Sequence, residues 1–334
     1  MEPGVTVNRS YNSYVNHMHP CYELDDIAIV FTRNPSITCV LLYVFLGLLS
    51  VFTTCGNLLV IISILYFKQL HVSTNYLILS LAVADLLVGM LAFPYNMAFT
   101  LTACWYRNDL FCKVRHSIGI AVGLASILHL CCISVDRYYA ICQPLTYRTK
   151  INSRVIGIMI LVSWGTPVLT GIVMNAGNNQ NYCEDGCFLD ALVSATVGSI
   201  FFFYIPVIIM LIIYLKIFLV AKRQANSIQN TICQSTKSRI TVSKTERKAT
   251  KTLAIIMGVF LLCWTPIDLC IIFQPLTYIV TPIAVVESLY WLAMSNSMLN
   301  PFIYAFFYSW FRSAFRIIIS GKILQGDFSN SQLR

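Results

Sequence analysis

Charge is scarce in this sequence. Only 11% of its 334 residues are charged, while 57% are hydrophobic and the mean hydropathy is +0.71. A soluble domain carries about a quarter charged residues, so a water-soluble protein is excluded and an integral membrane protein is expected. Residues 1–35 are polar and lack an apolar core. We therefore expect no cleavable signal peptide, and we expect the first hydrophobic block to direct its own insertion.

The sequence also lacks the short motifs of common enzymes. It has no HExxH pair, no nucleophile elbow and no phosphate-binding loop, so we expect neither an enzyme nor a metal site. Internal repeats and rings of charge along several apolar blocks are missing too, which disfavours a transporter or a channel. The net charge of +9 comes mostly from residues between the apolar blocks. This placement is typical of basic cytoplasmic loops and not of a nucleic-acid-binding surface.

Seven apolar blocks are long enough to cross a bilayer as helices, for which about 20 residues are needed. They run over 38–66, 73–99, 109–140, 152–174, 190–221, 245–274 and 279–306. The sequence thus predicts an all-α protein with three parts: an extracellular tail at 1–37, a seven-transmembrane bundle at 38–307, and a cytoplasmic helix with its tail at 308–334. The Ser/Thr/Gln-rich stretch Gln224–Ser243 is expected to be a mobile inner loop.

The orientation follows from the loops that are rich in Lys and Arg. One set of alternate loops holds most of the bases, including eight between Lys222 and Lys251, while the other set is acidic. Basic loops stay in the cytoplasm, so the N-terminus is expected outside, where Asn8 begins a glycosylation sequon. After the last block, Phe311, Phe315 and Ile318 fall on one helical face, with Arg312 and Arg316 beside them. This pattern predicts a short amphipathic helix in the lipid headgroups.

An acid–base pair ends the third block. Asp136, Arg137 and Tyr138 follow the apolar run that starts at Ile127. A charged pair there is costly unless it faces protein or water, so we interpret it as a conformational switch at the inner face. The alternative is that Arg137 only extends to the lipid headgroups.

A second residue could pair with Arg137 across the bundle. Glu246 begins the sixth block on the inner side, and an Arg137–Glu246 pair would hold the third and sixth helices together. Breaking the pair would open a cytoplasmic cleft by a two-state rearrangement of packed helices. Tyr214 and Tyr304 are expected to fill this cleft.

Polar side chains inside apolar blocks are candidates for function. Asp85 lies in the second block, Ser126 in the third, and Asn296 and Asn300 in the seventh. Together they could hold a sodium ion or a water network; the alternative is a buried, protonated Asp85 with no ion. Pro301 follows Asn300 directly and is expected to kink its helix. His129, deep in the third block, is expected to be a hydrogen-bonded core residue.

Several of these residues carry a resemblance. In order along the chain, they resemble the marks of rhodopsin-like G-protein-coupled receptors: Gly56-Asn57, Asp85, Asp136-Arg137-Tyr138, Trp164, Pro206, Cys263–Pro266 and Asn300–Tyr304. The segments Asn296–Phe311 and His129–Cys142 are similar to those of the trace amine-associated receptors. The resemblance implies a plasma-membrane receptor for small amines, with an olfactory or chemosensory role. It also implies a stimulatory heterotrimeric G protein, arrestin-type regulators and membrane lipid as partners.

The resemblance also implies two disulfides. Cys112 and Cys187 resemble the pair general to such receptors, and Cys21 and Cys183 resemble a second bridge found in the subfamily. Sequence alone does not fix the connectivity among five cysteines outside the membrane, and on the family pattern Cys104 is left over.

The sequence departs from the family at the ligand anchor. Members usually carry an Asp in the third span at the position that is Gly119 here, and a tyrosine at the position of Met294. The alternative fifth-span acid of some members falls on Gly198. A desolvated ammonium needs an anionic partner, and none of these positions supplies one.

Asp268 could replace the missing anchor. It lies one helical turn beyond Trp264, so both face the same side, and an unpaired Asp in mid-span would be expensive. The alternative is a protonated Asp268 bonded to a neighbouring helix. Glu287 and Asp190 are weaker candidates.

Two basic residues point to a different ligand. Arg115 and His116 lie one turn outside Gly119, where they would repel a cation and could bind a carboxylate. A receptor for an acidic ligand, or an orphan that has lost amine binding, is therefore the alternative function. Whether Asp268 or Arg115 faces the pocket would separate the two.

Overall fold

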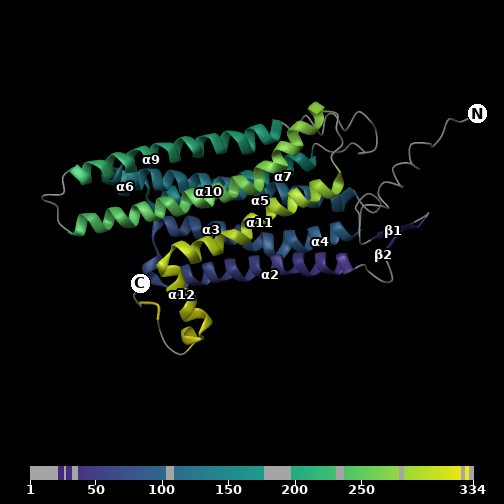
Figure 1. Ribbon diagram of the computed structural model, residues 1–334, viewed down its shortest axis with the longest axis horizontal. Helices are drawn as coiled ribbons and strands as arrows, with labels where there is room; N and C mark the ends of the chain where they lie inside the picture. Colours follow the sequence, from purple (N-terminus) through teal and green to yellow (C-terminus); the bar gives the residue numbers. More distant parts are fainter. Residues whose placement is uncertain are drawn as a thin grey trace, which may run out of the picture.

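The computed structural model describes residues 22–25, 28–31, 37–102, 109–176, 197–230, 237–277, 282–324 and 328–330. Within these ranges seven long helical segments run along one another as a bundle (Figure 1). The segments are α2 (Ile37–Tyr66), α3 (Ser73–Leu87) continued by η2 (Val88–Ala92) and α4 (Phe93–Thr102), α5 (Asp109–Cys142), α7 (Ser153–Ala176), η4 (Ile200–Tyr204) continued by α9 (Ile205–Asn230), α10 (Lys237–Thr277) and α11 (Ile283–Phe307). The predicted all-α bundle is confirmed.

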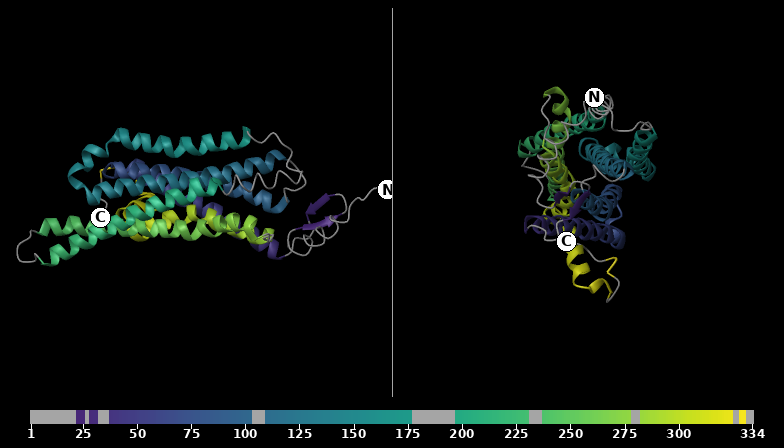
Figure 2. Two further views of the ribbon diagram at one scale, coloured as in Figure 1. Left: turned by 90° about the horizontal axis from the view of Figure 1, so that it is seen from above. Right: turned by 90° about the vertical axis from the view of Figure 1, so that its right-hand side faces the viewer.

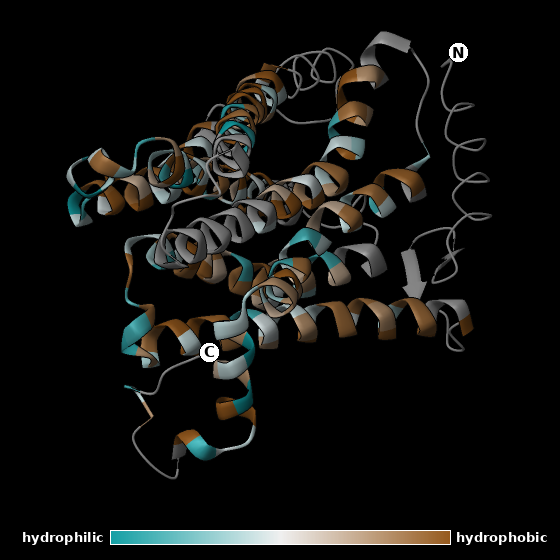
Figure 3. Cartoon of the chain, turned by 60° about the vertical axis from the view of Figure 1, so that its left-hand side comes forward, coloured by the Kyte–Doolittle hydropathy of each residue, from teal (hydrophilic) through white to brown (hydrophobic). Residues whose placement is uncertain are grey.

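The outer faces of the bundle are apolar. Hydrophobic residues cover most of the helical surface (Figure 3), and large side chains such as Leu161 and Phe218 are exposed on it. Six of the described helices are long and apolar enough to cross a membrane. Helix α11 carries the buried polar residues Asn296, Ser297 and Asn300. A surface this apolar is stable only in contact with lipid.

Helix α5 lies at the centre and packs against α3, α7 and α9. The largest core cluster includes Leu81, Ile127, Met210, Phe260 and Tyr304, which are all almost completely buried. Since these residues come from different helices, the core joins α3, α5, α9, α10 and α11.

Polar contacts inside the bundle support this packing. His129 is fully buried; its Nε2 lies 2.8 Å from Ser80 Oγ and its Nδ1 lies 2.7 Å from the Ala125 carbonyl oxygen. The indole of Trp164 donates to Ser80 Oγ at 2.9 Å. His129 is therefore a hydrogen-bonded core residue, as expected, and the three side chains join α3, α5 and α7.

The expected inner loop at Gln224–Ser243 is mostly wrong. Helix α9 continues to Asn230 and α10 begins at Lys237, so only 231–236 lie outside the described residues. The sequence has no Gly or Pro between 207 and 257, and these are the residues that most often end helices. A further short helix, α6 (Pro144–Lys150), follows α5 and was not predicted.

The N-terminal tail contains a hairpin that the sequence did not predict. Strands β1 (Tyr22–Asp25) and β2 (Ala28–Phe31) pair antiparallel, with Tyr22 opposite Phe31. The hairpin lies beyond the end of the bundle at which α2 begins (Figure 2).

Helix α12 (Ser309–Ile319) is the predicted amphipathic helix. Phe311 and Ala314 are buried, whereas Arg312 and Arg316 are exposed, and the helix projects away from the bundle axis (Figure 1). The tail then returns to the chain after α2: the Phe328 amide donates to Tyr66 Oη at 3.0 Å. The Phe328 ring packs on a small cluster formed by α12 and the turn η1 (Lys68–Leu70).

Candidate functional site

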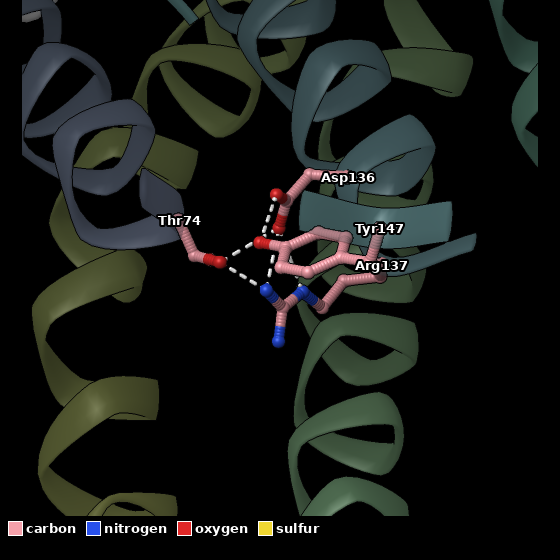
Figure 4. A network of polar contacts seen from close by, with 4 residues as sticks. All are labelled: Thr74, Asp136, Arg137 and Tyr147. Atoms are coloured by element: carbon pink, nitrogen blue, oxygen red, sulfur yellow. Dashed lines mark hydrogen bonds and ion pairs between the residues drawn. The ribbon is translucent and has the colours of Figure 1, made fainter. Parts of the chain in front are cut away.

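The acid–base pair at the end of α5 forms a closed network (Figure 4). Asp136 is fully buried, and its Oδ2 accepts from Arg137 Nε at 2.9 Å and from Nη2 at 2.5 Å. The same oxygen accepts from Thr74 Oγ1 at 2.7 Å, and Oδ1 accepts from Tyr147 Oη at 2.8 Å. Arg137 also contacts Thr74. The network thus joins α5 to α3 and α6, and every oxygen of the carboxylate has a donor.

Thr74 and Tyr147 were missed by the sequence analysis. Tyr147 lies in the loop helix α6, outside the membrane-spanning segments, where burial raises the pKa of its phenol and the Asp136 carboxylate raises it further. The phenol therefore stays protonated and acts as a donor. A signal was available in the sequence, since a tyrosine in a polar loop close to a buried Asp can reach it, but many loop residues meet that description.

The other residues of the predicted switch have different surroundings. Tyr304 is 2% exposed in the core, and Tyr214 packs against the same cluster. The ring of Tyr138 contacts that of Tyr139 edge to face, with centroids 5.7 Å apart. Helix α10 passes through Glu246, but its side chain lies outside the described residues, so the Arg137–Glu246 pair stays a prediction.

A second polar cluster lies in the middle of the bundle. Asn300 Nδ2 donates to Asp85 Oδ2 at 2.7 Å, and Asn57 Nδ2 donates to the Ser297 carbonyl at 3.0 Å. Ser126 is buried on α5. On α2, α3 and α11, four buried amide and carboxylate oxygens have no donor among the described residues: Asn57 Oδ1, Asp85 Oδ1, Asn296 Oδ1 and Asn300 Oδ1. Such a set of acceptors matches a hard cation or water molecules.

The candidate ligand anchor is buried between α9 and α10. Asp268 is 8% exposed, and Ser199 Oγ donates to its Oδ1 at 3.3 Å. Its other oxygen, Oδ2, has no partner among the described residues, and the same holds for the buried Trp264 Nε1 and Tyr204 Oη. Tyr204 is the last residue of the π-helical segment η4, which Ser199 directly precedes; this conformation is frequent at functional sites. A buried carboxylate oxygen without a donor is costly, and an ammonium would supply both donor and charge.

Three glycines in the membrane-spanning helices differ in how closely other side chains approach them. A Cβ on Gly119 would lie 2.0 Å from Tyr290 Oη, and a Cβ on Gly123 would lie 2.6 Å from Trp264 Cη2. Gly198 has open space around its Cα, with nothing within 4 Å of a Cβ. Tyr290 was missed by the sequence analysis, although an interior helical glycine is a general signal for close approach by a bulky partner.

Two further predicted ligand residues have defined places. Met294 is 1% exposed and packs in a cluster with Phe93 and Trp291, so it is a core residue. Glu287 is half-buried near the start of α11. The remaining predicted residues lie where no side chain is described: Arg115, His116, Cys112, Cys187, Cys21, Cys183, Cys104, Asp190 and Asn8.

Aromatic rings connect the ligand region with the core. Phe260 lies one turn below Trp264 on α10, and their ring centroids are 6.0 Å apart. Phe203 on η4 is 6.1 Å from Phe260. A shift of the Trp264 ring would therefore displace the side chains packed between α9 and α10, because close-packed interiors transmit displacements.

Known proteins resemble the chain over most of its length. The model of the family "7 transmembrane receptor (rhodopsin family)" matches residues 56–304. Trace amine-associated receptor 1 of Macaca mulatta is 41% identical over 330 residues, which are 94% of this chain and 97% of that receptor. Trace amine-associated receptor 8b of Rattus norvegicus is 41% identical over 94% of this chain and 96% of its own length. Trace amine-associated receptor 9 of Homo sapiens is 42% identical over 88% of each chain.

Proposed function

Because this chain belongs to the rhodopsin family of seven-transmembrane receptors and, within it, to the trace amine-associated receptors, we propose that it senses a small extracellular amine and signals through a stimulatory heterotrimeric G protein. The chain is a multi-pass membrane protein; the plasma membrane, an external N-terminus, arrestin-type regulators and an olfactory or chemosensory role complete the proposal.

The observation that supports the amine ligand is the surrounding of Asp268. The carboxylate is buried between α9 and α10, and one of its oxygens has no donor in the described part of the chain. A ligand ammonium placed there would pair with the charge and donate to this oxygen. Asp268 therefore takes the role that the third span plays in other members.

Signalling requires the ligand to favour one arrangement of the helices. An agonist acts only as far as it binds the open state more tightly than the closed one. In the proposal, ligand contact moves Trp264, and the stacked rings of Phe260 and Phe203 carry the shift towards the inner half of α9 and α10. The polar network of Asp136 and Arg137 then opens, together with the predicted Arg137–Glu246 pair.

The inner surface beside this network suits a G-protein segment. A hollow there is lined by Arg137, Ile141, Pro144 and Tyr147, and Leu145 on its rim is 97% exposed. An exposed leucine next to a basic hollow can serve as an apolar contact for a docking helix. Release of Arg137 from Asp136 would add a free guanidinium to the same surface.

The mid-bundle cluster is proposed to hold a sodium ion or a group of waters. Its four oxygens without donors are amide and carboxylate acceptors, which are ligands of hard cations. Because Asn300 and Asp85 bridge α11 and α3, an occupant would stabilise one packing of these helices.

The amine proposal is tested by a cyclic-AMP reporter assay in cells with measured surface expression. Mono- and diamines are compared with carboxylic acids and amino acids on wild type, Asp268→Asn and the control Glu287→Gln, which removes a charge from the start of α11. An amine response lost in Asp268→Asn and kept in Glu287→Gln supports the proposal. A response to acids would move the site to Arg115 and His116. An amine response that is kept in Asp268→Asn would remove Asp268 as the anchor and move attention to Glu287.

A further inference from the structure

Two aromatic side chains pack against two glycines of α5, in the space that a Cβ atom would occupy. Gly119 and Gly123 lie one helical turn apart, so they share a face of the helix. Tyr290 from α11 fills the space of a Cβ at Gly119, with Oη at 2.0 Å, Cζ at 3.0 Å and Cε2 at 3.3 Å. Trp264 from α10 fills the space at Gly123, with Cη2 at 2.6 Å and Cζ3 at 2.9 Å. Real Cβ atoms essentially never come within 3.0 Å of such neighbours, so any other residue must displace the rings.

Neither ring can move away without displacing the side chains that pack around it. Tyr290 packs in the cluster formed by Phe93, Trp291 and Met294, and its hydroxyl oxygen is buried. Trp264 is packed between this cluster and the main core. Close-packed interiors have few voids into which an aromatic ring could shift. The α5 side of the ligand region is therefore filled by protein.

The charge available to a ligand lies on other helices. Ser199, which precedes η4, donates to Asp268 on α10, and the carboxylate oxygen without a donor belongs to the same Asp268. At position 119 the glycine has no side chain, and the phenol of Tyr290 lies where one would begin. An acid introduced at position 119 would thus meet the ring of Tyr290 before it could meet a ligand.

We propose that Tyr290, seated on Gly119, is a specificity-determining residue that closes the α5 side of the site and confines the ligand ammonium to the α9–α10 side at Asp268. The class of ligand in this inference rests on the proposed amine function. The contact between Tyr290 and Gly119 does not depend on that function. The ligand it predicts is a compact amine, because the two rings occupy the space that a bulkier group would need beside α5.

A thermal double-mutant cycle tests the contact without any ligand. The midpoint of thermal inactivation is measured on detergent-solubilised receptor for wild type, Gly119→Ala, Tyr290→Phe and the double variant. Gly119→Ala should lower the midpoint by several degrees in wild type and by clearly less in Tyr290→Phe, which removes the atom at 2.0 Å but leaves Cζ at 3.0 Å. Gly258→Ala on α10, with nothing within 4 Å of its Cβ, is the matched control and should not lower it. Equal losses in both backgrounds would overturn the contact.

The role of Tyr290 in specificity is tested by introducing an acid at position 119. In the Asp268→Asn background, the amine response in the cyclic-AMP assay should stay absent with Gly119→Asp alone and return with Gly119→Asp combined with Tyr290→Ala, at comparable surface levels. A return with Gly119→Asp alone shows that Tyr290 does not close the site, and a silent triple variant at normal surface level also overturns the proposal. If wild type itself ignores amines, the proposed function fails, while the thermal cycle still decides the contact.

Discussion

Asp136 and Asp268 are both buried carboxylates in membrane-spanning helices, yet their surroundings differ. Asp136 accepts from Arg137, Thr74 and Tyr147, so both of its oxygens have donors. Asp268 accepts one long hydrogen bond from Ser199 and keeps an oxygen without a donor among the described residues. Burial penalises both charges, but only the first is compensated by protein.

The difference indicates opposite roles for the two carboxylates. A carboxylate that is fully paired by its neighbours fixes the helices that supply the donors, so the inner network stabilises one packing. A carboxylate that is incompletely paired costs stability; in the proposed function, a cationic ligand removes this cost at Asp268. The first site is expected to respond to mutation in stability and basal signalling, and the second in ligand potency.

The largest effect is expected from breaking the inner network. Asp136→Ala leaves the guanidinium of Arg137 without its carboxylate, which should cost about 3 kcal/mol, the lower end for a broken buried pair, because Arg137 is 18% exposed. Basal cyclic AMP should rise and the thermal midpoint should fall. Asp136→Asn keeps the shape of the side chain, so its basal cyclic AMP and its thermal midpoint should lie between those of wild type and Asp136→Ala. Wild-type basal signalling at normal surface level would contradict the switch.

Asp268→Asn is expected to show the opposite pattern. Amine potency should fall at least tenfold, equivalent to about 1.4 kcal/mol, because the charge that pairs with the ammonium is lost. The ligand-free receptor should be as stable as wild type or more so, since a buried charge without a full set of donors has been removed. Dose–response curves and thermal midpoints on the same preparations measure both. A loss of stability with unchanged potency would make Asp268 a structural residue.

Sodium is expected to change the thermal midpoint through the mid-bundle cluster, and this change should be smaller than the two effects above. Sodium chloride should raise the thermal midpoint of wild type, because an ion that binds the folded state stabilises it by mass action. Asp85→Asn should abolish the increase, and choline chloride at equal concentration controls for ionic strength. An identical increase in the variant would leave water as the occupant of this cluster.

The smallest effect is expected from Tyr147→Phe. The change removes one donor from Asp136 and leaves the pair with Arg137 intact, so it should cost about 1 kcal/mol and raise basal signalling slightly. Tyr139→Phe, at a ring that packs on Tyr138, is the matched control. If Tyr147→Phe raised basal signalling as much as Asp136→Ala, the loop helix α6 would be the main element that restrains the switch.

The position of each membrane helix could be predicted because apolar length is a local property. About 20 apolar residues suffice to span a bilayer, and such runs can be counted in the sequence. The amphipathic helix α12 followed in the same way from the spacing of Phe311, Arg312 and Phe315. The ends of α9 and α10 could not be predicted from polarity alone, because Gln224–Asn230 is polar but contains nothing that ends a helix.

The partners of the polar residues could be predicted only in part. The neighbourhood of Asp136 and Arg137 is set by the sequence, as the two are adjacent, but the donors Thr74 and Tyr147 come from 62 residues before and 11 residues after Asp136. Asp268 was singled out because an acid inside an apolar run is expensive wherever it lies. Its partner Ser199 is 69 residues away, and no local pattern identifies it.

The sequence by itself determined that this protein crosses the membrane as a helical bundle, which residues are polar inside it, and that the third-span acid is absent. These properties depend on composition and on the periodicity of a single helix. Only the tertiary structure decided that Tyr290 lies on Gly119, that Trp264 lies on Gly123, and that one oxygen of Asp268 is left without a donor. These properties depend on how closely separate helices approach, and that distance is set by the packing of side chains that are far apart in the chain.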